Sequence, residues 1–93
     1  MRLTDIEIEA IKNAVIERDA NAEVYLFGSR IDDNAKGGDI DILVISKDLK
    51  LDDKLFIKAR IFETIEEQKL DIVISNDVEE PFVKLAIERG VRL

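Results

Sequence analysis

The sequence predicts a small α/β or α+β domain in which helices pack against a short β-sheet. Three observations predict this class. Helix-like and strand-like segments alternate along the chain, the strand-like segments are short and rich in branched apolar residues, and polar turns separate them. A chain of 93 residues fits one domain with a single modest core. We therefore expect one domain over residues 1–93, with its elements in the order α-β-(turn)-β-α-β-α.

The first element is predicted to be a helix that begins at a capping box. In the segment Thr4-Asp5-Ile6-Glu7, the threonine side chain can accept a hydrogen bond from the glutamate amide while the glutamate side chain reaches back. Ile8, Ile11 and Val15 then recur on one helical face. The pattern ends near residues 19–21, so the helix is expected to stop there.

Two strands joined by a polar connection are predicted next. Residues 23–27 have the branched and aromatic side chains that favour a strand. Residues 30–38 are polar, with room for one helical turn at their start, and Gly37 and Gly38 mark a flexible or positive-φ turn. The second strand, residues 39–45, is apolar on both faces after its first residues. This pattern is typical of a central strand that is covered on both sides.

A second helix is predicted over residues 52–68, and a third strand over residues 70–74. The last predicted helix begins near Pro81, which is tolerated in a first helical turn, and Gly90 is a suitable C-cap. Residues 91–93 form either a fraying end or a short edge strand. The second helix is expected to bury Leu55, Ala59, Phe62 and Ile65, the last helix contains Phe82, Leu85 and Ala86, and we place Phe56, Phe62 and Phe82 in the core.

The composition limits the chemistry that the protein can carry out. There are no cysteines and no histidines, which excludes disulfides, thiolate metal sites and the usual zinc ligands. A bound metal would need oxygen ligands, which favours Mg²⁺ or Mn²⁺. The net charge of −7 argues against general binding to nucleic acids, because phosphate backbones require lysine and arginine. No apolar run could cross a bilayer and no signal-peptide pattern is present, so we expect a cytoplasmic protein without membrane association.

The candidate site lies where the first strand ends and the second begins. Gly28-Ser29 follows the first strand, and Asp39 and Asp41 are one residue apart, so that their carboxylates point to the same side of a strand. Asp71 lies in another apolar strand. Burying a carboxylate without a partner costs on the order of several kcal/mol, and a divalent cation would remove this penalty. In the alternative interpretation, Asp39 is a turn residue and Asp41 pairs with a nearby lysine or arginine.

With these residues, the chain resembles the polymerase-β-like nucleotidyltransferase superfamily. More narrowly, it resembles the minimal nucleotidyltransferase (MNT) proteins, many of which are antitoxins paired with HEPN-domain toxins. The shared signature is Gly-Ser followed by Asp-x-Asp, here Gly28-Ser29 and Asp39-Ile40-Asp41, with a third carboxylate on a later strand, here Asp71. The resemblance covers nearly the whole chain. It implies a small mixed sheet with helices packed on it, in which the three aspartates meet at one sheet edge.

The resemblance also implies a role for each residue of the signature. Asp39, Asp41 and Asp71 would be the catalytic and metal-binding residues, holding Mg²⁺ or Mn²⁺, and Asp71 would also help to deprotonate the acceptor hydroxyl. Gly28 and Ser29 would bind the β- and γ-phosphates of a nucleoside triphosphate through backbone N–H groups and the serine hydroxyl.

The polar connection contains two cations, of which Arg30 is a further candidate for binding the nucleotide and Lys36 a weaker one. Arg30 either contacts nucleotide phosphate or pairs at the surface with Asp32 or Asp33. Lys36 is expected to be solvated, and Asp32-Asp33-Asn34 is typical of a turn.

The resemblance implies an enzyme that moves a nucleoside monophosphate, AMP from ATP, onto a hydroxyl of a protein acceptor. The acceptor would be a tyrosine of a HEPN-domain toxin, which this protein would silence as an antitoxin, and a basic toxin would be attracted by the acidic chain. A second hypothesis is a non-catalytic antitoxin that neutralises its partner by forming a complex. A third, an aminoglycoside-type nucleotidyltransferase, ranks last because those proteins usually carry an additional domain. So small a domain with an open site is expected to work beside a partner, in a hetero- or homo-oligomer.

Overall fold

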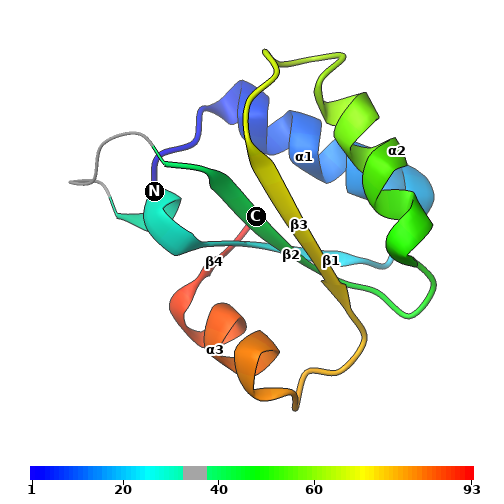
Figure 1. Cartoon of the computed structure of the whole chain (residues 1–93), viewed down its shortest axis with the longest axis vertical. Coiled ribbons are helices and arrows are strands. Elements are labelled where there is room, and N and C mark those ends of the chain that lie inside the picture. Colours follow the sequence, from blue (N-terminus) through cyan, green and yellow to red (C-terminus); the bar gives the residue numbers. More distant parts are fainter. Residues whose placement is uncertain (33–37) are drawn as a thin grey trace.

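The computed structural model describes residues 1–32 and 38–93, and it confirms the predicted class, a small α+β fold (Figure 1). Asp33, Asn34, Lys36 and Gly37, for which the sequence made predictions, lie outside the described residues. The elements in chain order are α1 (Asp5–Arg18), β1 (Glu23–Phe27), the 3₁₀-helix η1 (Gly28–Ile31), β2 (Ile40–Ile45), α2 (Leu51–Ile61), β3 (Leu70–Ser75), α3 (Pro81–Arg89) and β4 (Val91–Arg92).

The strands of the described residues form one mixed sheet in the order β3-β2-β1-β4. Strand β1 is antiparallel to both β2 and β4, whereas β2 and β3 are parallel. The mixed sheet that the family resemblance implied is therefore present. The two alternatives for residues 91–93 are also decided, because Val91 and Arg92 form an edge strand beside β1.

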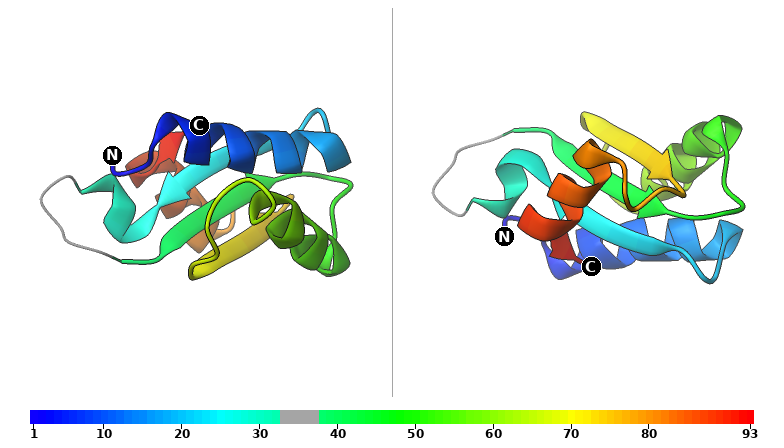
Figure 2. Two further views of the ribbon diagram at one scale, coloured as in Figure 1. Left: turned by 90° about the horizontal axis from the view of Figure 1, so that it is seen from above. Right: turned by 90° about the horizontal axis from the view of Figure 1, so that it is seen from below.

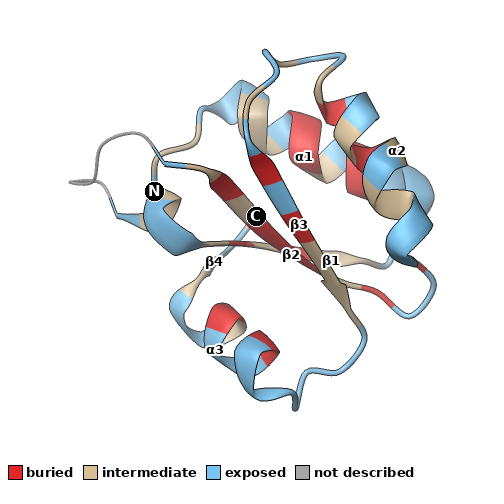
Figure 3. Ribbon diagram, in the orientation of Figure 1, coloured by how far each residue is buried: buried red, intermediate tan, exposed pale blue. Residues whose placement is uncertain are grey.

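Helices cover both faces of the sheet, as the two rotated views show (Figure 2). Helices α1 and α2 pack on one face, and α3 packs on the other. Strand β2 serves both layers, since Ile42 and Val44 belong to the larger cluster and Leu43 belongs to the cluster with Val83 and Ala86 of α3. Figure 3 shows the buried positions along β2 and on the inner sides of the helices. The prediction of a central strand covered on both sides is confirmed.

The predicted N-terminus of α1 is confirmed in detail. The Thr4 Oγ1 atom accepts a hydrogen bond of 3.1 Å from the Glu7 amide, and Glu7 Oε1 accepts one of 2.9 Å from the Thr4 amide. This reciprocal pair satisfies two of the amides that a helix start leaves without partners. Ile11 and Val15 are fully buried, as their spacing predicted. No helix in residues 1–32 or 38–93 is long and apolar enough to cross a membrane.

The prediction for α2 was wrong in its length and in part of its buried face. The helix ends at Ile61 rather than near residue 68, and residues 62–65 form turns that lead toward β3. Leu55 is 77% exposed and Ala59 is also exposed, whereas Ile57 and Ile61 are fully buried. The helix carries apolar residues on two faces, and contact with α1 and the sheet determines which face is buried. Phe62 and Ile65, expected on that face, are partly buried against the same core.

Helix α3 is confirmed, but its phenylalanine is not a core residue. Pro81 occupies the first turn, and the Glu80 side chain accepts hydrogen bonds from the Phe82 and Val83 amides. Because Val83 faces the sheet, the adjacent Phe82 lies at the side of the helix and remains 45% exposed. Phe56 is only partly buried, with its ring 3.7 Å from the Arg18 guanidinium carbon.

Gly90 caps α3 as predicted, although its backbone is extended, with a φ of −83°. A Cβ at this position would lie 2.5 Å from the Leu26 carbonyl oxygen and 2.4 Å from that of Ala86. Close approach of the backbone to β1, rather than a left-handed conformation, therefore requires glycine.

A buried polar pair joins the end of α1 to the end of β2. Ser46 Oγ donates a hydrogen bond of 2.5 Å to Asp19 Oδ2, and it accepts one of 3.0 Å from the Leu49 amide. Asp19 and Ser46 are both buried, and Asp19 Oδ1 also accepts from the Asn21 amide at 3.0 Å. The carboxylate is thus satisfied within the protein, which removes most of the cost of burying it.

We expect Ser46→Ala to lower the free energy of unfolding by about 1–3 kcal/mol, because it leaves the buried Asp19 carboxylate without its hydroxyl donor. Urea denaturation of the two proteins measures the difference. Ser75→Ala is the matched control. Ser75 lies beside Ile45 in the β2–β3 pairing, and its hydroxyl accepts only an exposed contact from the Asp77 amide. An equal loss in both variants would contradict the importance of the buried pair.

Candidate active site

Two of the predicted aspartates lie side by side on neighbouring strands. Asp41 of β2 is paired in register with Asp71 of β3, and these two strands are parallel. Paired residues on adjacent strands are about 4.8 Å apart and point to the same face. This is the face on which Leu43 and Val73 contact the α3 cluster. Asp41 is partly buried and Asp71 is exposed, so the pair is open to solvent.

The surroundings of Asp41 favour its protonated form. Burial raises the pKa of Asp41, and the negative charge of Asp71, a hydrogen bond with Asp71 and the charge of Asp39 raise it further. The Lys69 charge acts in the opposite direction. Like charges this close disfavour simultaneous ionisation, so a nearby positive charge would favour the ionised form of Asp41.

The third aspartate is held by a lysine. Asp39 Oδ2 lies 3.3 Å from Lys69 Nζ, and the Asp39 side chain is 42% exposed. The hydrogen bond to Asp39, the charge of Asp39 and then that of Asp71 raise the pKa of Lys69. The alternative interpretation from the sequence expected an ion pair for Asp41. In the structure it is Asp39 that has the ion pair, while Asp41 interacts with Asp71.

The donor set is suited to a divalent cation, although it is not a closed cage. Within residues 1–32 and 38–93, no three acidic side chains converge as a ready-made metal cluster. The oxygens of Asp39, Asp41 and Asp71 are nevertheless hard ligands of the kind that Mg²⁺ prefers. The described cation beside them is the Lys69 ammonium, 3.3 Å from Asp39. A divalent cation would offset more of the negative charge of the three carboxylates, so the residues fit such an ion.

Two glycines allow the turn after β1 to pack against the start of β2. Gly28, the first residue of η1, has a φ of +78°, and a Cβ there would lie 2.4 Å from Asp41 Oδ2. Gly38 has a φ of +93°, and its Cβ would lie 2.2 Å from Ser29 Oγ. The positive φ predicted for the Gly37-Gly38 turn is therefore found at Gly38. The structure brings Gly28 against Asp41 and Ser29 against Gly38, so these residues of the predicted signature lie close together.

Arg30 connects the turn to two other segments. Its guanidinium donates to the carbonyl oxygen of Arg2 at 2.9 Å, to that of Gly38 at 3.2 Å and to Gln68 Oε1 at 3.1 Å. These contacts position the turn rather than only neutralising a surface charge. They describe neither of the two roles weighed from the sequence, and a contact with phosphate stays a prediction.

Several residues of the site were missed by sequence reasoning. Arg2 donates to the carbonyl oxygens of Ser29 and Asp32, at 3.1 and 2.8 Å, which fixes η1 against the N-terminal segment. Nothing in the pattern around Arg2 indicated this contact. Lys69 could have been found, because it lies two residues before Asp71 and side chains two apart along an extended chain share a face.

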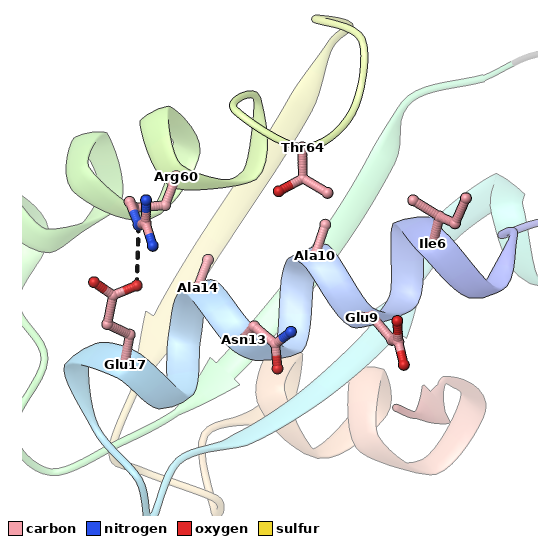
Figure 4. Close-up of a pocket in the computed structure, with 8 residues that line it drawn as sticks. All are labelled: Ile6, Glu9, Ala10, Asn13, Ala14, Glu17, Arg60 and Thr64. Atoms are coloured by element: carbon pink, nitrogen blue, oxygen red, sulfur yellow. Dashed lines mark hydrogen bonds and ion pairs between the residues drawn. The ribbon is translucent and has the colours of Figure 1, made fainter.

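Two hollows lie on opposite sides of the molecule. One is a groove of about 130 Å³ between α1 and α2, where Ala10 and Ala14 form the floor and Arg60 reaches Glu17 at 3.0 Å (Figure 4). It lies on the sheet face away from the aspartates. The other has a volume of about 210 Å³ and is lined by residues that include Gly28. We call this second hollow the α3 pocket, and it adjoins the aspartate site through Gly28. Its lining residues come from the end of β1, from η1 and from α3: Phe27, Gly28, Ile31, Phe82, Leu85, Ala86 and Arg89.

We expect Asp71→Asn to lower the pKa of Asp41 toward its ordinary value of 3.8, because the substitution removes the neighbouring negative charge. Carboxyl ¹³C chemical shifts, followed by NMR during a pH titration in EDTA, measure the change. Asp77→Asn, which removes an exposed carboxylate outside the site, should leave the pKa of Asp41 unchanged.

The same shift affects stability. The pKa of Asp41 is higher in the folded protein than in the unfolded chain. The free energy of unfolding therefore has its full contribution from Asp41 below about pH 4, and this contribution is lost as the pH rises through the folded pKa. This loss of stability with rising pH should be smaller in Asp71→Asn than in the wild-type protein. An Asp41 pKa that is identical in the two proteins would show that the carboxylates do not interact.

Comparison with known proteins identifies the family of the chain. No curated protein matches the chain at a significant level. The model of the family described as "Polymerase beta, Nucleotidyltransferase" matches residues 9–93, a range that contains the Gly-Ser turn and all three aspartates. The chain therefore belongs to the polymerase β nucleotidyltransferase family.

Proposed function

We propose that this nucleotidyltransferase-family domain is a metal-dependent enzyme that moves AMP from ATP onto a hydroxyl of a protein acceptor. The observation that carries the proposal is the pairing of Asp41 with Asp71 on one sheet face. Asp39 lies one position before β2, and the Gly28 backbone lies against the Asp41 carboxylate. This arrangement supplies carboxylate oxygens and a side-chain-free surface at the same place.

Each residue of the site has its own proposed role in the reaction. Asp39 and Asp41 would hold Mg²⁺ or Mn²⁺, which when bound supplies positive charge to the triphosphate. Asp71, the most exposed of the paired carboxylates, accepts the proton of the attacking hydroxyl. Gly28 and Ser29 bind the β- and γ-phosphates and hold the pyrophosphate end of the nucleotide in place. The bond from the acceptor oxygen to the α-phosphorus forms as the bond to pyrophosphate breaks.

The exposed position of the site supports a macromolecular acceptor. Asp71 and Lys69 are exposed, and Asp39 is only partly covered, so a side chain on another protein can reach them. The net charge of −7 favours a basic protein over RNA or DNA. On the resemblance to MNT antitoxins, we propose a tyrosine of a HEPN-domain toxin as the acceptor and its inactivation as the result.

We expect Asp39→Asn/Asp41→Asn to abolish transfer of label from α-labelled ATP to the partner, because the variant lacks two metal ligands. The assay contains Mg²⁺ and the protein encoded beside this one, or a host lysate, as acceptor. Asp48→Asn/Asp52→Asn is the matched control, since it removes the same charge from two exposed positions outside the site. The other nucleoside triphosphates, labelled in the same way, identify the preferred donor.

The same variants distinguish an enzyme from an antitoxin that neutralises its partner only by forming a complex. If the Asn variant still binds the partner but no longer neutralises it, catalysis is required. Neutralisation that persists without label transfer would contradict the proposal and identify a non-catalytic binding module.

We expect Mg²⁺ to raise the melting temperature of the wild-type protein relative to EDTA, because a ligand that binds only the folded state stabilises it. At a concentration about 100 times the Kd, the gain is about 2.7 kcal/mol. A scan by differential scanning fluorimetry measures this shift. The Asp39→Asn/Asp41→Asn protein should show no Mg²⁺-dependent shift, whereas the Asp48→Asn/Asp52→Asn control should behave as the wild type. Equal shifts in all three proteins would place Mg²⁺ elsewhere.

A further inference from the structure

The α3 pocket lies directly beside the aspartate site. Phe27, at the end of β1, is the cross-strand partner of Asp41 in β2. Residues paired across antiparallel strands point to the same face, with their Cβ atoms about 5 Å apart. Phe27 lines the pocket, and so does Gly28, whose backbone lies against the Asp41 carboxylate. One wall of the pocket is therefore also the edge of the proposed metal site.

The pocket is lined almost entirely by apolar groups. The rings of Phe27 and Phe82 meet edge to face, with centroids 5.5 Å apart and planes at 83°. Leu85 of α3 also lines the pocket and is 46% exposed. Arg89, one helical turn further on, is the one charged side chain among the lining residues that the structure describes. The described residues that line the pocket include no carboxylate, so its chemistry differs from that of the neighbouring aspartates.

This combination suits a flat aromatic ring better than a sugar or a phosphate. Aromatic and aliphatic walls give favourable contact to the face of a nucleobase without requiring a particular pattern of hydrogen bonds. The guanidinium of Arg89 can donate hydrogen bonds to acceptors on the edge of a purine, or stack on its π-system. A ribose or triphosphate would leave most of its polar groups without partners there.

We propose that the α3 pocket binds the nucleobase of the nucleoside triphosphate, with a preference for purines. This proposal rests on the proposed function, because it requires the triphosphate to lie at the aspartates and Gly28. The base is joined to the α-phosphate through one ribose, so it must lie close to the metal site, and the α3 pocket begins at that site. Purines expose more ring surface for stacking than pyrimidines, and the walls bury this surface.

The test compares ATP with inorganic tripolyphosphate, which has the same phosphates but no base. Isothermal titration calorimetry with Ca²⁺ in place of Mg²⁺, to slow turnover, gives both dissociation constants. We expect the wild-type protein to bind ATP at least fivefold more tightly than tripolyphosphate, and ATP and GTP more tightly than CTP and UTP. A base–aromatic contact of this kind is worth about 1–3 kcal/mol, which corresponds to this fold-change or more.

Two variants test whether the α3 pocket provides the additional affinity for ATP over tripolyphosphate. Leu85→Ser and Phe82→Ala should each weaken ATP binding about threefold or more and leave tripolyphosphate binding unchanged. Leu85 is exposed, so its replacement should not disturb folding, and circular dichroism checks the fold of both proteins. Leu55→Ser is the matched control. It replaces an exposed leucine on α2, on the opposite side of the sheet, and should change neither dissociation constant.

Each outcome bears on a different part of the argument. Wild-type protein that binds neither ligand would contradict the proposed function itself. Equal affinity for ATP and tripolyphosphate, unaffected by Leu85→Ser, would overturn the base pocket and leave the proposed function standing. If Leu85→Ser weakened binding of the acceptor protein and not of ATP, the pocket would hold an aromatic side chain of the acceptor, and the proposal would again be wrong.

Discussion

The register between the parallel strands β2 and β3 is the constraint on which the rest of the site depends. Because Asp41 is paired with Asp71, two carboxylates must lie next to each other on one sheet face. A shift of one residue along either strand would turn one of them toward the opposite core, where α1 and α2 pack. The buried residues that follow on both strands prevent such a shift, since Ile42 and Ile72 belong to the same core cluster. Packing on the face covered by α1 and α2 thus determines where the two carboxylates lie on the other face.

Much of the fold could be predicted from the sequence because its local signals agree. The capping box at Thr4, the apolar strand after Asp41 and the proline at the start of α3 each have a local physical cause. The wrong predictions concern choices that depend on distant parts of the chain. Leu55 and Ile57 are equally good core residues by their chemistry, and only the position of α1 and the sheet decides that Ile57 is buried.

The residues of the candidate site also differ in how far the sequence could predict them. The Gly-Ser turn and the aspartates were predictable, because spacing along a strand and resemblance to a family both pointed to them. The partners of Arg30 and Lys69 were not, because only the folded chain brings them together, although the spacing of Lys69 from Asp71 could have placed the lysine on the same face. Arg30 contacts Arg2 and Gln68, and Lys69 reaches Asp39 from the loop before β3. These contacts depend on how segments far apart in the sequence meet.

Placing Asp41 beside Asp71 has an energetic cost, and this cost supports the proposed metal site. The burial and the neighbouring negative charges that raise the pKa of Asp41 are unfavourable for its ionised form. In contrast Asp19, the buried carboxylate near the other end of β2, receives hydrogen bonds from Ser46 and Asn21. The chain can therefore satisfy a buried carboxylate with its own donors. At Asp41 it places two more carboxylates and a glycine backbone instead. Such local conflict is expected where a site is arranged for a ligand rather than for stability.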